Sequence, residues 1–352
     1  MLTNHRKQVI WAVCLFFLII FSANQIYILG GKLASLMPMS KTAMVLDVAD
    51  LASSSTPMVV EKIIVKKIKL AFVGDIMLDR GVKQSVYKNF NGDYSLLFSK
   101  VSGLLAGYDI LSGNLEGPVS SEGSDIGGIY SFRMEPKVLP VLSGVGFKVL
   151  TVANNHIFNW GRIAFTDTLQ LLTDSAIVYP GGGLNGAEAY EGKAINIRGV
   201  NIAMLSFNES KAGVITPDSE NYGIAVISEE EIVKNVSLAK QNNDLVIVSY
   251  HFGEEYQDEP NNYQKKYAEL AIDSGADLVV GNHPHVIQSL ERYKNSYIIY
   301  SLGNFIFDQD FSLKTMVGGL LEVEINPESK QIEGATLKKV QLNSFFQIES
   351  IE

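Results

Sequence analysis

The sequence predicts an α/β fold built on a mostly parallel sheet with both faces covered. Short apolar runs alternate with segments of helical spacing from about residue 68 onward, which is the pattern of βα units. Several of these runs end directly in Gly, Asn, Asp or His, as strands do where a parallel sheet binds a ligand. A chain of 352 residues with 47% hydrophobic and 19% charged residues can bury a sizeable core, in one large domain or two ordinary ones.

An uncharged run over residues 9–29 precedes this region and is long enough to span a bilayer. Residues 1–8 contain Arg6 and Lys7 and no acid, so we expect a cytoplasmic N-terminus and a single-pass membrane protein with its domain outside the cell. A cleaved signal peptide is one alternative, because residues 9–21 also fit an h-region, and a buried helix is another. No small-x-small cleavage pattern is evident, since Ala23 has Phe21 two residues before it.

Residues 30–67 are rich in small, polar and helix-breaking residues and are predicted to be a linker, which leaves residues 68–345 as the domain. The one cysteine, Cys14, precedes the domain and excludes both a disulfide and a Cys-based metal site within it. The net charge of −9 includes no long basic block, which argues against nucleic acid as a partner. An anionic substrate would therefore need a local site, such as a metal.

In order along the chain, each expected strand is an apolar run that ends at a turn residue. We expect strands at 69–73, 108–112, 148–152, 194–197, 201–207, 245–250, 277–280 and 297–301. Helical spacing of apolar residues predicts helices at 136–143, 163–175, 229–241 and 262–274. Residues 317–325 and 331–342 alternate in polarity on either side of Asn326-Pro327-Glu328, which predicts a closing hairpin.

Metal-binding and acid–base residues stand at these strand ends. Four of the five histidines follow apolar runs, and His and carboxylate together suit Zn, Mn or Fe. Each position has an ordinary alternative, such as a helix cap or an Asx turn, but one rim would bring all of them together. Asn155 offers a carbonyl oxygen to a metal. His156 would act as a general acid that protonates a leaving oxygen. The remaining positions are Asp75, Glu116, His251, His283 and His285.

Six motifs occur in a fixed order and resemble those of CapA-type capsule or poly-γ-glutamate synthesis proteins, a branch of the metallophosphoesterase-like superfamily. They are Phe72-Val73-Gly74-Asp75-Ile76-Met77, Gly113-Asn114-Leu115-Glu116, Ala153-Asn154-Asn155-His156, His251-Phe252-Gly253-Glu254-Glu255-Tyr256, Gly281-Asn282-His283-Pro284-His285-Val286 and Ser301-Leu302-Gly303-Asn304-Phe305. The resemblance covers roughly residues 68–311. It agrees with the membrane anchor, because the family is typically anchored with its domain outside.

The resemblance implies a four-layer α/β sandwich of metallophosphoesterase type with a two-metal centre, in which Glu116 bridges and His156 is the acid. It also departs from the superfamily pattern: Met77 stands where a His is usual, so the second metal site is expected to be weak, and Asn159 stands where an Asp is frequent. The implied ligands are Asp75, Glu116, Asn155, His251, His283 and His285. Arg80, Asn114, Asn154, Glu255 and Asn304 are the expected contacts to the substrate or to the ligands.

We therefore expect a membrane-anchored, metal-dependent protein of capsule or poly-γ-glutamate biosynthesis or export. Its site would hydrolyse or transfer a phosphoester or a γ-glutamyl bond, with an anionic polymer or phosphoester as substrate and capsule-synthesis subunits as partners. A non-enzymatic polymer-binding or scaffold subunit is one alternative. A generic extracytoplasmic phosphodiesterase is the other.

Overall fold

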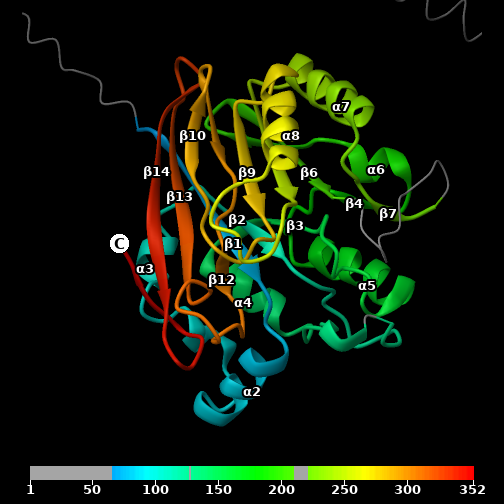
Figure 1. Ribbon diagram of the computed structural model, residues 1–352, viewed down its shortest axis with the longest axis vertical. Coiled ribbons are helices and arrows are strands. Elements are labelled where there is room, and N and C mark those ends of the chain that lie inside the picture. The colour runs from blue at the N-terminus through cyan, green and yellow to red at the C-terminus, as the bar shows by residue number, and fades with distance from the viewer. Residues whose placement is uncertain (1–65, 127, 210–220) are drawn as a thin grey trace, which may run out of the picture. The chain divides into compact units, whose positions relative to one another are not determined.

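The computed structural model describes residues 66–126, 128–209 and 221–352 (Figure 1). The predicted anchor at 9–29 and nearly all of the predicted linker lie outside these ranges. Within them, no helix is both long and apolar enough to cross a bilayer.

A seven-stranded mixed sheet contains the first three strands of the domain. Its order is β15-β14-β13-β1-β2-β3, and β12 pairs with β1 as well. The pairs β1–β2, β2–β3 and β1–β12 are parallel, whereas β13, β14 and β15 are antiparallel to their neighbours. The strands are β1 (Ile68–Ile76), β2 (Ile110–Leu115), β3 (Phe147–Thr151), β12 (Asn304–Ile306), β13 (Val317–Asn326), β14 (Gln331–Leu342) and β15 (Ile348–Ile351).

A six-stranded sheet contains the second half of the fold, in the order β10-β11-β9-β8-β6-β5. Its four central strands are parallel, and β5 and β10 are antiparallel edges. The strands are β5 (Lys193–Ile197), β6 (Val200–Asn208), β8 (Leu245–His251), β9 (Leu278–Asn282), β10 (Leu290–Tyr293) and β11 (Ser296–Ile299). A separate two-stranded ribbon pairs β4 (Gly182–Gly183) with β7 (Gly223–Ile224).

The helices fall between these strands. Three have the capping residues that the sequence supplies: Asn185 accepts a hydrogen bond from Glu188 N, Ser228 accepts one from Glu231 N, and Asn261 forms a capping box with Gln264. The α-helices are α2 (Arg80–Asn89), α3 (Ser102–Leu105), α4 (Val138–Val145), α5 (Gly161–Asp174), α6 (Gly186–Tyr190), α7 (Glu229–Asn242) and α8 (Asn262–Asp273). Short 3₁₀ turns lie at Tyr94–Leu97 and Gly128–Tyr130.

The side chains of β1 show how the layers stack, because successive residues of a strand point to opposite faces. Leu70 and Phe72 pack against residues of the six-stranded sheet, such as Ile247 of β8. Ala71 and Val73 belong instead to a core that includes residues of α2, α4 and α5. The outer face of the six-stranded sheet packs on α7 and α8 (Figure 1). The order is therefore helices, seven-stranded sheet, six-stranded sheet, helices.

The predicted α/β class is confirmed, and so are the four layers that the family resemblance implied, whereas the prediction of one mostly parallel sheet is wrong. The strands divide between two mixed sheets, and each sheet is covered by helices on one face and by the other sheet on the opposite face. Apolar periodicity reports that a strand is buried on both sides but not what buries it. The β13–β14 hairpin is as predicted, and the predicted strands at 194–197 and 201–207 pair as β5 and β6. β15 adds a strand beyond residue 345, where we expected the domain to end.

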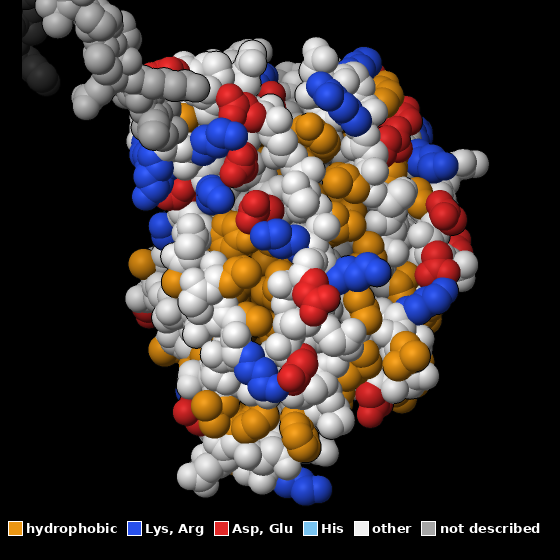
Figure 2. Space-filling view, turned by 90° about the vertical axis from the view of Figure 1, so that its left-hand side faces the viewer, with side chains coloured by type: hydrophobic (Ala, Val, Ile, Leu, Met, Phe, Trp, Pro, Cys, Tyr) orange, Lys and Arg blue, Asp and Glu red, His pale blue; other side chains and the backbone are white. Residues whose placement is uncertain are grey.

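Charges of both signs alternate over the face that β14 lines (Figure 2). Lys67 lies 2.8 Å from Glu324, and Lys338 lies 3.1 Å from Glu322. Exposed pairs of this kind each contribute only about 0–1 kcal/mol to stability. They nevertheless leave this face without an extended patch of one sign.

Candidate metal centre

The predicted ligands meet where the carboxyl ends of strands from both sheets come together. Asp75 is the penultimate residue of β1, and His251 is the final residue of β8. The others stand in the segments that directly follow β2, β3 and β9. These are Glu116 after β2, Asn155 and His156 after β3, and His283 and His285 after β9. The carboxyl ends of parallel strands are the usual ligand-binding edge of an α/β sheet, so this placement agrees with the sequence prediction.

Two glycines allow the backbone to approach closely at this edge. A Cβ on Gly74 would lie 1.8 Å from the carbonyl oxygen of Gly303, and one on Gly281 would lie 1.9 Å from that of Tyr300. No side chain fits at either position without moving the neighbouring backbone. Asp75 N then donates to Gly303 O at 2.9 Å, which places the carboxylate beside the segment that carries Asn304.

Asp75, Glu116 and His285 form a fully buried group whose ligand atoms all lie within 4.8 Å of one another. Asp75 Oδ1 accepts a hydrogen bond from Asn114 Nδ2 at 2.8 Å, and Oδ2 accepts one from the backbone N of His283 at 3.2 Å. His285 Nδ1 lies 3.3 Å from Asp75 Oδ2, and its Nε2 lies 3.8 Å from Glu116 Oε1. Two carboxylates and an imidazole at this spacing are a donor set that suits Zn, Mn or Fe.

Glu116 is the least satisfied member of this group. Within the described residues, no group donates a hydrogen bond to either of its carboxylate oxygens, although the side chain is fully buried. Burial and then the charge of Asp75 raise the pKa of Glu116 well above its usual value. A buried carboxylate without donors is costly to fold around unless a cation binds there. The residues present therefore fit a divalent metal.

His285 supplies a positive charge beside these acids when it is protonated. Burial alone would lower its pKa, but the charge of Glu116 and the hydrogen bond to Asp75 outweigh burial and raise the pKa to about 9. Nδ1 also lies 2.9 Å from Asn304 Oδ1, and the amide nitrogen of Asn304 donates to Thr315 O, so Oδ1 is the acceptor. The Nδ1 proton is thereby held in place, which leaves Nε2 as the atom available to a metal.

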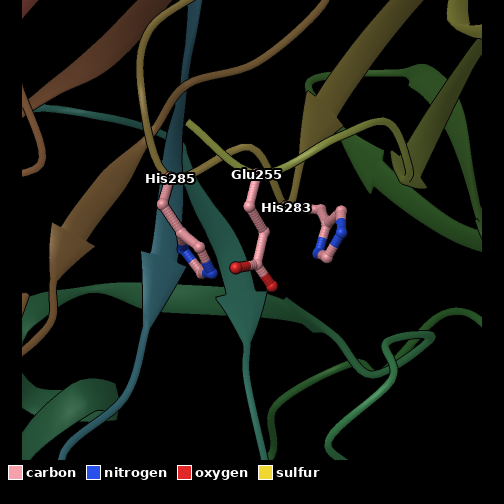
Figure 3. Close-up of side chains that lie close together, drawn as sticks. All are labelled: Glu255, His283 and His285. Carbon is pink, nitrogen blue, oxygen red and sulfur yellow. The ribbon is translucent and has the colours of Figure 1, made fainter. Parts of the chain in front are cut away.

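A second group of possible ligands contains His283, His285 and Glu255. Figure 3 shows the Glu255 carboxylate lying between the two imidazole rings. The sequence suggested Glu255 only as a contact to the substrate or to the ligands, because it follows no strand. His285 is common to both groups, so it is the residue that connects them.

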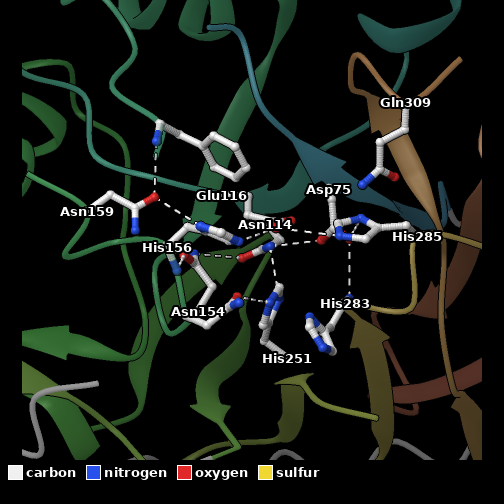
Figure 4. Close-up of polar contacts among 12 residues, drawn as sticks. Asp75, Asn114, Glu116, Asn154, His156, Asn159, His251, His283, His285 and Gln309 are labelled. Carbon is white, nitrogen blue, oxygen red and sulfur yellow. Dashed lines mark hydrogen bonds and ion pairs between the residues drawn. The ribbon is translucent and has the colours of Figure 1, made fainter. Parts of the chain in front are cut away.

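His251 is joined to the cluster through Asn114 (Figure 4), and Asn155 is joined to His251. Asn114 Oδ1 accepts from Asn154 Nδ2 at 3.2 Å, so its Nδ2 is the group that faces His251 Nδ1, also at 3.2 Å. His251 Nδ1 is thus an acceptor, and Nε2–H donates to Asn155 Oδ1 at 2.7 Å. A metal at this position would replace that proton. In the described part of the chain, His251 belongs to neither group above, and its role as a ligand stays a prediction.

His156 points at Glu116 from the opposite side of the cluster (Figure 4). Its Nδ1 lies 2.9 Å from Asn159 Oδ1, which also accepts from Phe132 N, so Nδ1 carries the proton and Nε2 faces Glu116 Oε1 at 3.8 Å. Burial lowers the pKa of His156 to about 4, against the hydrogen bond to Asn159. Asn159 stands where the family resemblance led us to look for an Asp, and its amide oxygen orients the ring without adding charge.

Backbone conformation around the cluster is unusual. His283, His285, Tyr256 and Arg80 have φ angles of +99°, +59°, +64° and +50°, a region that residues with a Cβ seldom adopt. Such conformations cost of order 1–3 kcal/mol each and gather at functional sites. Sequence reasoning did not find them, because none of these residues is a glycine.

Met77 is fully buried, and its Sδ accepts a hydrogen bond from Asp79 N at 3.3 Å. The thioether sulfur is therefore engaged by the backbone, at the position where the resemblance led us to look for a histidine. Arg80, expected as a substrate contact, pairs with Asp308 through Nε at 3.1 Å. Arg80 and Asp308 line a cavity of about 300 Å³ that opens beside His156 and His285.

Residues 69–309, most of the chain, match the family of the bacterial capsule synthesis protein PGA_cap. The chain belongs to this family. It is 34% identical over 255 residues to the capsule biosynthesis protein CapA of Bacillus anthracis, a match that covers 70% of this chain and 61% of that protein. It is 32% identical over 245 residues to the PGA biosynthesis protein CapA of Bacillus subtilis strain 168, with 69% and 64% covered. The chain thus matches less than two thirds of the length of each relative.

Two solved structures are similar to this PGA_cap member at lower identity. A phosphatase from Mycoplasma pneumoniae has a TM-score of 0.48 at 16% identity, and the match covers 79% of this chain and 94% of that one. A 5′-nucleotidase precursor from Thermus thermophilus has a TM-score of 0.47 at 11% identity, with 78% and 54% covered.

Proposed function

We propose that this chain is a metal-dependent protein of capsule or poly-γ-glutamate biosynthesis or export. Residues 9–29 would anchor it in the cell membrane, and the domain would lie outside the cell. Membership of the PGA_cap family supports the biosynthetic role. The buried group of Asp75, Glu116 and His285 supports the dependence on metal.

The observation that carries the proposal is the buried Glu116 carboxylate without a hydrogen-bond donor among the described residues. Asp75, Glu116 and His285 Nε2 would hold one metal, and His283 and Glu255 offer atoms for a second. Bound metal would polarise a phosphoryl or acyl oxygen and lower the pKa of a water molecule. We propose hydrolysis or transfer of a phosphoester or γ-glutamyl bond as the reaction.

His156 would supply the proton for the leaving oxygen. Its Nδ1 proton is held by Asn159, so Nε2 is the atom that would receive and deliver the transferred proton. With a pKa of about 4 the free imidazole is neutral at pH 7, and a bound anionic substrate would favour the protonated form. Asn154 supports this placement, because its Oδ1 accepts from the backbone N of His156 at 3.2 Å.

The test is metal content together with turnover. Purified full-length protein should contain transition metal by elemental analysis, and His283→Ala and His285→Ala should each reduce it. His5→Ala is the matched control, since His5 is the one histidine that follows none of the predicted strands. The wild type should turn over aryl phosphoesters or γ-glutamyl anilides, and the variants that contain less metal should show less of this turnover. A metal-free wild type whose melting does not respond to Zn or Mn would refute the proposal.

The membrane anchor has a test of its own. Full-length protein should remain in the membrane fraction after high-salt and carbonate washes, with residues 68–352 accessible to protease from outside. A soluble product that begins near residue 24 would show instead that residues 9–29 are part of a cleaved signal peptide.

A non-enzymatic polymer-binding or scaffold subunit is the second candidate, and Met77 is the observation that favours it. Its buried sulfur makes a backbone hydrogen bond, so the Asp75 side of the centre lacks one nitrogen ligand of the superfamily pattern. Capsule or polymer production that still needs the domain but tolerates His156→Asn would favour the scaffold. Loss of production in the same variant would favour the enzyme.

A further inference from the structure

The cavity beside the metal centre has mostly aromatic walls. Phe132 and Phe307 pack edge to face with ring centroids 5.7 Å apart, and Tyr256 and Phe311 do the same at 5.2 Å. Tyr130 also lines the cavity. The volume of about 300 Å³ is at the lower end of the range for small-molecule sites, so it has room for roughly one ring.

This wall is continuous with the metal centre. The rings of Phe132 and His156 are 4.2 Å apart, and those of Phe307 and His285 are 4.9 Å apart. The leaving group, or the part of a substrate next to the reacting bond, would therefore lie directly against these aromatic rings. Tyr256 stands above His285 at a ring distance of 6.0 Å and closes this side.

The charges that line the cavity are already paired. Arg80 contacts Asp308 through both Nε and a terminal nitrogen, each at 3.1 Å, and its guanidinium lies 5.1 Å from the centre of the Phe132 ring. His285 faces Asp75 and Glu116. Arg80, the one Lys or Arg among the described residues that line the cavity, is thus engaged by Asp308, and Glu255 adds a further carboxylate.

A γ-linked glutamate chain carries one free carboxylate on every residue, and this cavity would repel each of them. An uncharged ring matches it, because rings stack on aromatic faces and edges without needing a counter-charge. We propose that the site takes a phosphoester whose uncharged ring lies in this cavity, with the phosphate at the metal centre. This inference rests on the proposed function and selects the phosphoester over the γ-glutamyl bond.

Binding of phosphonates, which are not hydrolysed, tests the inference without requiring turnover. Mn-loaded full-length protein should bind phenylphosphonate about 10-fold more tightly than methylphosphonate by calorimetry, the upper end of what one aromatic contact supplies. Tri-γ-glutamate should bind more weakly than phenylphosphonate. Phe311→Ala and Tyr130→Ala, which remove exposed parts of the wall, should reduce the preference for the phenyl group to about 3-fold or less and leave methylphosphonate unchanged.

Matched controls stand next to both positions. Leu313→Ala and Ile129→Ala remove side chains that are 87% and 90% exposed and do not line the cavity, so they should leave both affinities unchanged. Equal affinity for the two phosphonates, or tighter binding of tri-γ-glutamate, would contradict the proposed ring site without contradicting the proposed metal centre. If metal-loaded protein bound neither phosphonate, both this inference and the proposed reaction would fail.

Discussion

Glu116→Gln should stabilise the metal-free protein and weaken its response to metal. Gln has the shape of Glu but no charge, so it removes the cost of a buried carboxylate that has no hydrogen-bond donor among the described residues. Because the pKa of Glu116 is raised, folding disfavours its ionised form, and at neutral pH the substitution relieves that penalty. An unsatisfied buried group costs about 1–3 kcal/mol. The charge attraction to protonated His285 is lost at the same time, so we expect a net gain of about 1 kcal/mol.

The two effects can be measured by thermal melting with and without a chelator. At a metal concentration about 100-fold above Kd, wild type gains about 2.7 kcal/mol, and a variant whose Kd is 100-fold weaker gains about 0.4 kcal/mol. One kcal/mol corresponds to a change in Tm of about 2–4 °C for a domain of this size. In chelator the variant should therefore melt about 2–4 °C above wild type. With metal it should melt below wild type.

Glu135→Gln is a control of opposite sign. Burial opposes ionisation of Glu135, but Lys83 and the hydroxyls of Tyr94 and Tyr87 together hold its pKa below the usual value. Removing that charge should lower Tm in chelator and in metal alike. If Glu116→Gln also lowered Tm in chelator, or if its gain from metal equalled that of wild type, Glu116 would be an ordinary structural acid.

Three further predictions concern the same centre. The pKa of His285 is raised to about 9, so the stabilisation that its charge gives the metal-free protein is fully present below pH 6.5 and is lost as pH rises through 9. Melting in chelator should show this loss of stability in the wild type, and His285→Asn should not show it. His156→Asn should keep its metal by elemental analysis and lose on the order of 10²–10⁴-fold in turnover, the usual scale for a general acid. Emptying of the site would make His156 a ligand instead. Met77→His should raise the metal content measured at equilibrium from one tightly bound ion toward two and increase turnover of a simple phosphoester; an unchanged content would show that this position does not reach the metal.

The strand ends were predictable from the sequence because they combine two independent signals. β8 and β9 begin and end within two residues of their predicted bounds, since an apolar run meets a turn that contains His or Gly. The side chains at those ends share one rim whichever sheet each strand joins, so the cluster could be foreseen without knowledge of the topology.

Other features depend on contacts that no local pattern records. β12 has three residues and becomes a strand only by pairing with the end of β1. Helix α2 has no side-chain cap, because Asp79 accepts from Arg133 N instead, and it was missed. Glu255 reaches His283 and His285 from a loop whose next residue, Tyr256, has a φ of +64°. A positive φ is expected from sequence mainly at glycine, so the turn at Tyr256 has no recognisable sequence pattern.

The two sheets each supply part of the donor set, and this has a mechanical consequence. Asp75 belongs to the seven-stranded sheet, whereas His283 and His285 follow a strand of the six-stranded sheet, and Asp75 and His283 are 208 residues apart in sequence. A metal held by both would act as a reversible cross-link across the sandwich, closing a loop of more than half the chain. With a single cysteine, Cys14, the chain cannot form an internal disulfide that would serve the same purpose. Metal supply would then control how firmly the two halves hold together, independently of the redox state around them.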